Sequence, residues 1–140
     1  MMLQRAIEIR ASPDRVWSIM RDVQRWPAWT SSVTSVELLD GAAFAVGARA
    51  RIRQPRLPPA VWEVTVLDDA SRTFSWVSRA PGLRVTGLHR VDPAAAGSVA
   101  TLGLEFAGPL GPFWGRLSRG ISDRYVDIEA RGLKAESEKG

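Results

Sequence analysis

The chain has 140 residues, of which 45% are hydrophobic, and its formal net charge is +4. This length and apolar content predict a single globular domain over residues 1–140. The absence of cysteine excludes disulfides, thiolate metal sites and cysteine nucleophiles. No run approaches the roughly 18 apolar residues of a membrane span, and the N-terminal MMLQRAIEIR lacks the apolar core of a signal peptide. We therefore expect no transmembrane segment and a cytoplasmic location.

The positive charge raises the question of nucleic acid binding. Almost all basic residues are arginines, and acidic residues are interleaved with them along the chain. The one local cluster runs from Arg49 to Arg56, and Glu63 on the following strand is a cross-strand partner for it. We therefore expect no nucleic acid partner.

The first elements are a strand and two short helices. Leu3 to Arg10 alternates apolar and polar residues, which predicts a strand. Ser12-Pro13-Asp14 is typical of a helix start, with a hydroxyl cap, proline at the first helical position and an acid near the positive end of the helix dipole. This helix should reach Arg21 and bury Val16, Trp17 and Met20. Pro27 disfavours a regular helix at Trp26, so residues 22–29 predict a broken second helix.

From Ser31 onward the hydrophobic period becomes that of β-strands. Short turns containing glycine, proline or aspartate separate the apolar runs. The predicted strands are Val33 to Leu39, Ala48 to Gln54, Ala60 to Leu67, Arg72 to Arg79, Leu83 to Val91 and Ser98 to Ala107.

The last element is predicted to be one long amphipathic helix from Leu110 to about Ala135. Its expected buried stripe is Leu110, Trp114, Leu117, Ile121, Ile128, Gly132 and Ala135. Its expected solvent face is Arg116, Arg119, Asp123, Asp127, Ala130 and Lys134, with ion pairs from Arg119 to Asp123 and from Asp127 to Arg131.

These elements predict an α+β fold. An antiparallel sheet of about seven strands must cover its apolar face, and only the C-terminal helix is long enough to do so. We expect the sheet to curl around that helix, with the two short helices closing one end. This arrangement leaves a cavity between the sheet and the long helix.

Several stretches resemble the START-like, pollen-allergen-like (SRPBCC) superfamily with its helix-grip fold, and more narrowly its bacterial polyketide cyclase/dehydrase branch. They are IEIRASPDRVWSIMRDVQRWPAWTSSV, the glycine of AVGARARIR, the tryptophan of FSW, LHRVDP followed by Gly97, and GLKAESE. The resemblance covers essentially the whole chain. It implies a cavity for a hydrophobic ligand, since members include cyclases, lipid or hormone binders and chaperone cofactors. It supplies no catalytic motif that can be matched residue by residue.

Most catalytic chemistries have no motif here. His89 is the single histidine, and the sequence contains no HExxH, GxGxxG, GxxxxGK[ST] or GxSxG pattern. We therefore expect no metal and no other cofactor. Aldol cyclisation of a polyketide stays open, because it needs a base, hydrogen-bond donors for carbonyl groups and a cavity that excludes water. The catalytic candidates are His89 as the base, with Arg124 and Tyr125 as donors; the alternative is that His89 is structural and that Arg124 and Tyr125 reach solvent.

The six tryptophans divide between core and cavity. Trp17, Trp62 and Trp114 are assigned to the core, and the other three to the cavity, where an indole N–H finds a polar partner. The predicted ligand-binding residues are Trp26, Trp29, Trp76, His89, Leu104, Phe106, Leu117, Ile121, Arg124 and Tyr125.

Two functions remain open at this point. The first is binding of a hydrophobic small molecule or lipid in the cavity, with or without polyketide cyclase, aromatase or dehydratase activity. The second is a non-catalytic protein-interaction module that uses the basic edge from Arg49 to Arg56 and the loop Pro55 to Pro59. The sequence also leaves a homodimer open.

Overall fold

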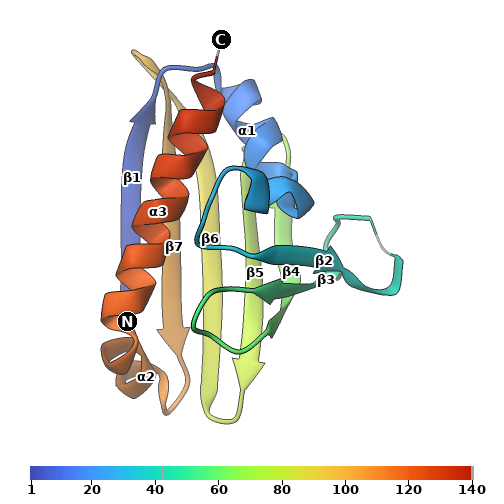
Figure 1. Ribbon diagram of the computed structural model, residues 1–140, viewed down its shortest axis with the longest axis vertical. Helices are drawn as coiled ribbons and strands as arrows, with labels where there is room; N and C mark the ends of the chain where they lie inside the picture. Colours follow the sequence, from blue (N-terminus) through green and yellow to red (C-terminus); the bar gives the residue numbers. More distant parts are fainter. Residues whose placement is uncertain (42, 140) are drawn as a thin grey trace.

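The predicted helix-grip fold is confirmed by a computed structural model of the chain, which describes residues 1–41 and 43–139 (Figure 1). The strands are β1 (Met2–Ile9), β2 (Ser35–Leu38), β3 (Arg49–Arg53), β4 (Ala60–Asp68), β5 (Thr73–Ala80), β6 (Leu83–Ala94) and β7 (Gly97–Ala107). The helices are α1 (Pro13–Arg21), α2 (Gly111–Leu117) and α3 (Arg119–Ser137), with 3₁₀ turns η1 (Val23–Ala28) and η2 (Leu39–Gly41). None of the described helices is both long and apolar enough to cross a membrane.

The seven strands form one antiparallel sheet in the order β1-β7-β6-β5-β4-β3-β2. Helix α3 lies against β1 and β7, whereas β2 and β3 run across the front of the sheet (Figure 1). The register between β4 and β5 shifts between Val64 and Val66, which marks a bulge in β4. Helix α3 therefore covers the sheet near its β1 edge, and the strands of the opposite edge, β2 and β3, curl over the same face.

The two short helices after β1 form as the sequence predicts. The Ser12 side chain accepts a hydrogen bond from the Arg15 backbone N–H at 3.2 Å, and Pro13 opens α1. Val16, Trp17 and Met20 are buried. The broken second helix is η1, and the indole N–H of Trp26 fixes it by donating to the Met20 carbonyl at 2.9 Å.

The single long helix predicted over Leu110 to Ala135 is wrong, because the chain forms α2 and α3 with a break at Ser118. The hydroxyl of Ser118 donates to the Trp114 carbonyl at 2.7 Å, a back-bond that bends helices. Gly115 and Gly120 flank the break, and glycine is a weak helix former.

The predicted buried stripe of this region is wrong at four of its seven positions. Leu117 is 64% exposed, and Leu110, Trp114 and Ala135 are exposed as well. Ala130, assigned to the solvent face, is fully buried. The buried residues of α3 are Val126, Ala130, Leu133 and Ser137. The small residues Ala130 and Gly132 let α3 pack closely on β1, α1 and the end of η1.

Two predicted charge pairings differ from the structure. Asp123 binds Arg5 of β1 at 3.1 Å instead of Arg119, although Asp127 does pair with Arg131 at 3.1 Å. Glu63 is the cross-strand neighbour of Arg49, as predicted, but the Arg49 guanidinium binds Asp40 at 2.8 Å. Arg51 binds Glu37 at 3.2 Å, so half of the predicted basic edge is already paired within the chain.

Candidate functional site

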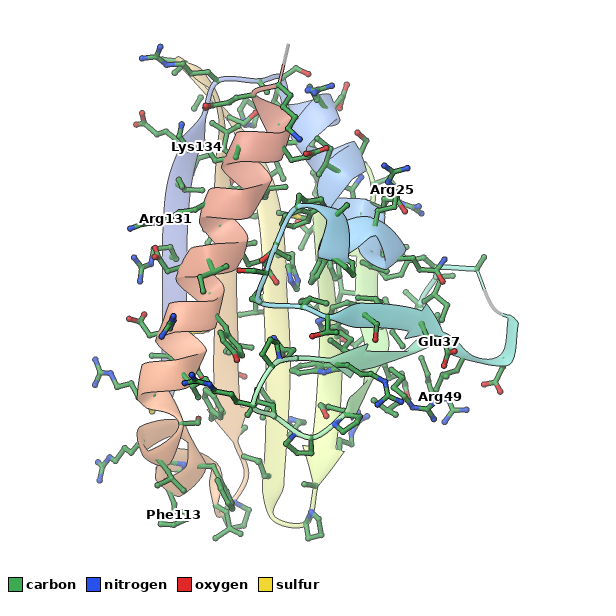
Figure 2. All side chains as sticks on the ribbon, viewed as in Figure 1. Arg25, Glu37, Arg49, Phe113, Arg131 and Lys134 are labelled. Carbon is green, nitrogen blue, oxygen red and sulfur yellow. The ribbon has the colours of Figure 1, made fainter. Side chains whose placement is uncertain are left out.

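A largely apolar cavity of about 370 Å³ lies between the sheet, α3 and the β3–β4 loop. Strands β5 to β7 supply its floor, helices α2 and α3 one wall, and the loop residues Gln54, Leu57 and Pro58 the opposite wall. Leu57, Pro58 and Trp114 are exposed, so the mouth lies between the loop and α2. Trp26 and His89 are buried, which places them at the inner end. Figure 2 shows side chains of α3 and of the central strands pointing toward one another in this region.

His89 and Glu129 face each other at the inner end. His89 Nε2 lies 3.7 Å from Glu129 Oε2, and their side chains are only 5% and 15% exposed. The imidazole stacks on Phe74 with ring centroids 4.0 Å apart. Its Nδ1 atom has no hydrogen-bond partner among the described residues. The two side chains are therefore buried side by side, but at 3.7 Å they do not form a hydrogen bond.

Burial sets the protonation of both groups. It lowers the pKa of His89 from 6.5 to about 3, and it raises the pKa of Glu129 from 4.5 to about 8, because each charged form is poorly solvated there. At neutral pH the carboxyl group holds a proton and the imidazole is neutral. The inner end thus places a carboxyl O–H beside an unprotonated, weakly basic ring nitrogen in an apolar cavity.

This pair predicts that stability is greatest between about pH 4.5 and 6.5. In that range both states hold one proton, on Glu129 when folded and on His89 when unfolded. Above pH 6.5 the unfolded pair holds none, whereas folded Glu129 keeps its proton to about pH 8. The free energy of unfolding should therefore fall by about 2 kcal/mol over this interval. Below pH 4.5 folded His89 resists the second proton that the unfolded chain accepts, so stability falls again.

Thermal denaturation across this pH range measures the effect. Glu129→Gln should remove the loss above pH 6.5 and make the acid loss begin near pH 6.5 instead of 4.5, because only His89 then titrates; Glu105→Gln on the exposed face of the sheet should change neither limit. An unchanged alkaline decline in Glu129→Gln would show that other groups cause it.

The other two catalytic candidates point elsewhere. The hydroxyl of Tyr125 donates to the Pro55 carbonyl, and its ring lines the cavity. Tyr125 therefore ties α3 to the β3–β4 loop and closes that side. Arg124 is exposed and lies outside this cavity; it lines a second hollow of about 440 Å³ together with Arg56.

Most, but not all, of the predicted ligand-binding residues line the cavity. Those that do are Trp26, Trp76, His89, Leu104, Phe106, Ile121 and Tyr125. Trp29, Leu117 and Arg124 are not among the lining residues. Leu117 is on the exposed side of α2, and Trp29 packs beside Trp26 with ring centroids 5.7 Å apart.

The division of the tryptophans needs a further correction. Trp17 is in the core, as predicted, but Trp62 and Trp114 line the cavity instead. The indole of Trp76 crosses β6 at Gly87, where a Cβ atom would lie 2.8 Å from its Nε1. No described residue accepts a hydrogen bond from that N–H, which leaves a donor at the cavity wall.

Glu129 is a residue of the candidate site that sequence reasoning missed. It lies four residues after Tyr125 and eight after Ile121, so all three share one helix face. This four-residue spacing was the feature of the sequence that could have identified Glu129 as a cavity residue. Ser118 and Ser122 also line the cavity, and they lie nearer its mouth than Glu129 does. No group of three or more histidine or acidic side chains in residues 1–41 and 43–139 is arranged as a metal site.

Comparisons with known proteins agree with this architecture. A proposed polyketide cyclase of Streptomyces halstedii is 34% identical over 89 residues, which cover 61% of this chain and 70% of that protein. The crystal structure of the Zhui aromatase/cyclase from Streptomyces sp. R1128 matches with a TM-score of 0.79 and 17% identity over 99% of this chain and 93% of that one. A Thermus thermophilus protein of known crystal structure matches with a TM-score of 0.77 and 19% identity over 98% and 97% of the two chains.

The sequence profile of one family covers almost the entire chain. It matches residues 2–138, from the first strand to the end of α3, and is described as polyketide cyclase / dehydrase and lipid transport. Its span includes every wall of the cavity. The chain therefore belongs to the polyketide cyclase/dehydrase and lipid transport family.

Proposed function

We propose that this chain binds a hydrophobic, oxygen-bearing small molecule of the polyketide type in the cavity and promotes its cyclisation. The observation that carries the proposal is the buried pair of Glu129 and His89, 3.7 Å apart at the inner end of an otherwise apolar space. A binding site for a pure hydrocarbon has no use for such a pair, because buried polar groups without partners cost stability. A carbonyl oxygen of the ligand would give the Glu129 O–H an acceptor.

The same pair suits an intramolecular aldol reaction. His89 Nε2 would take a proton from the carbon between two carbonyl groups as Glu129 gives up its own, because the carboxylate left 3.7 Å away would stabilise the imidazolium that burial otherwise disfavours. The deprotonated carbon would form a bond to another carbonyl carbon of the same molecule. The oxygen of that carbonyl would receive the Glu129 proton and become a hydroxyl group. Transfer of the new proton from His89 to the Glu129 carboxylate would restore the starting pair. All atoms come from the substrate and these two side chains.

The length of the cavity supports a folded chain rather than a small polar substrate. Ile121 and Glu129 both line it from α3, and their eight-residue separation corresponds to about 12 Å along a helix. Between them the wall is apolar or hydroxylated. The buried pair of Glu129 and His89 would therefore act on one end of an elongated ligand. The rest of the ligand would lie against aromatic and aliphatic side chains.

Ligand discrimination tests this proposal. A hydroxyanthraquinone and anthracene share a three-ring frame and differ in their oxygens, so displacement of an apolar fluorescent dye compares them directly. The ratio of the affinity for the hydroxyanthraquinone to that for anthracene should be about tenfold higher in the wild type than in Glu129→Leu. A tenfold change is the effect of one hydrogen bond in an apolar site.

The matched control is Glu105→Leu, which removes a carboxyl group from the exposed outer face of β7 and should keep the preference. Saturable dye binding with no oxygen preference would leave an apolar carrier and refute the role of Glu129. Absence of saturable binding by the native protein would refute the cavity proposal altogether.

A further inference from the structure

The mouth of the cavity opens beside an exposed apolar tip. Leu110, Phe113, Trp114 and Leu117 lie on α2 or directly before it, and they are 44%, 59%, 41% and 64% exposed. Leu57 faces them across the mouth and is 39% exposed. Figure 2 shows Phe113 at the extreme end of the molecule, away from the core. The apolar lining of the cavity therefore continues onto the surface.

Unpaired arginines lie on α2, at the start of α3 and on the outer face of the neighbouring hairpin. Arg116 and Arg119 flank the end of α2, and Arg79 and Arg84 lie on the β5–β6 hairpin. The hairpin lies beside the tip, because the Leu110 backbone N–H donates to the Gly82 carbonyl at 2.8 Å.

The segments that form the tip carry basic residues and no acidic ones. None of these four guanidinium groups pairs with an acid in residues 1–41 and 43–139, and residues 78–88 and 106–122 contain no aspartate or glutamate. Arginines elsewhere are mostly paired: Arg5, Arg21, Arg25, Arg49, Arg51, Arg72, Arg90 and Arg131 each lie within 4.0 Å of a carboxylate. The tip is therefore one of the places where guanidinium groups lie without a carboxylate partner among the described residues; Arg53, Arg56 and Arg124 are others.

We propose that this tip docks the protein on the surface of an anionic lipid bilayer, so that the cavity mouth opens toward the lipid. Aromatic and aliphatic side chains rimmed by guanidinium groups, with no carboxylates to repel lipid phosphates, are the pattern of an interfacial anchor. A hydrophobic ligand could then exchange with the membrane without crossing water. Docking itself is independent of the proposed function; only its use for ligand exchange rests on that function.

The shape of the tip favours a bilayer over a protein partner. Stable protein complexes bury about 1,200–2,000 Å² in well-packed interfaces. Helix α2 has only seven residues, and its apolar side chains project from one end of an elongated molecule. Such a projection can enter the headgroup region of a membrane, but it offers little area to a flat protein surface.

Sedimentation of the full chain with lipid vesicles tests the proposal. Vesicles of phosphatidylcholine mixed with phosphatidylglycerol should bind the wild type, and vesicles of phosphatidylcholine alone should bind it at least tenfold more weakly. Phe113→Ser/Leu117→Ser should weaken binding to the anionic vesicles at least tenfold, because two side chains no longer enter the apolar layer. Arg116→Gln/Arg119→Gln should reduce the preference for anionic vesicles at least fivefold.

Two control variants match these changes. Val46→Ser alters a side chain that is 63% exposed, against 64% for Leu117, and Arg131→Gln alters an arginine paired with Asp127; neither should change vesicle binding. Failure to bind either vesicle overturns the proposal, as does binding that the Phe113 and Leu117 changes leave intact. Binding through the same residues to an acidic acyl carrier protein, but not to vesicles, overturns it in favour of a protein partner. Dye binding in the cavity is measured on the same samples, so that failure of docking and failure of the proposed function are separate results.

Discussion

Gly132→Ala should destabilise the protein by about 3 kcal/mol, which lowers Tm by roughly 10 °C for a chain of this size. Gly132 lies where α3 crosses the end of η1, and a Cβ atom there would overlap with the carbonyl oxygen of Trp29. The obstacle is backbone rather than a mobile side chain, so it cannot move away without displacing η1. Helix propensity alone would make alanine the better residue by about 1 kcal/mol, so a loss of stability reports the packing.

Gly120→Ala is the matched control in the same helix. Nothing lies within 4 Å of a Cβ atom at this position. Stability should therefore stay constant or rise by up to about 1 kcal/mol. Equal thermal transitions for Gly132→Ala and the wild type would show that α3 does not rest on η1. The comparison measures how tightly the C-terminal helix is held by the segment that also carries Trp26 of the cavity.

The strands and the first helix could be predicted because their signals are local. The alternation of Ala48, Ala50 and Ile52 with arginines fixes which face of β3 is buried, whatever the partner. Ser12 and Pro13 fix the start of α1 through a cap and a preset backbone angle. In both cases the information lies within a few residues of the element itself.

The C-terminal helices could not be predicted in the same way. Their apolar residues are divided between two surfaces: Leu110 and Leu117 face solvent at the tip, whereas Ala130 and Leu133 face the core. A periodic pattern that assumes one buried face merges these two surfaces into a false stripe. The back-bond from Ser118 to Trp114 ends α2 and gives α3 a different face to bury.

Within the candidate site, the sequence predicted the inward position of His89 but not its partner. Strand alternation is enough for His89, which falls on the apolar register of β6. Glu129 on a charged helix has the appearance of an ordinary solvent-exposed acid. Its burial results from contact between α3 and distant strands. Trp62 and Trp114 were not predicted to line the cavity for the same reason. Only the tertiary fold determines whether an indole is enclosed by other side chains or borders a cavity.

Cyclisation of an aromatic substrate with a pendant 1,3-diketone chain should be about 10² to 10⁴ times slower in Glu129→Gln and in His89→Gln than in the wild type. Glutamine keeps a hydrogen-bond donor at position 129 but has no acidic proton to give to the new hydroxyl group. At position 89 it has no basic ring nitrogen. The double variant should be no slower than the slower single variant, because each change already interrupts the same proton cycle.

The pH dependence of this reaction separates catalysis from binding. The wild-type rate should fall above about pH 8, where Glu129 loses the proton that it must donate, and Glu129→Gln should lack this decline. Ser122→Ala changes another cavity-lining group, away from the inner end, and should alter the rate less than about threefold. If Glu129→Gln and His89→Gln bind the substrate normally and cyclise it at the wild-type rate, the buried pair performs no chemistry. The cavity would then hold its ligand as a carrier, and the 3.7 Å contact would be a structural feature of the inner end.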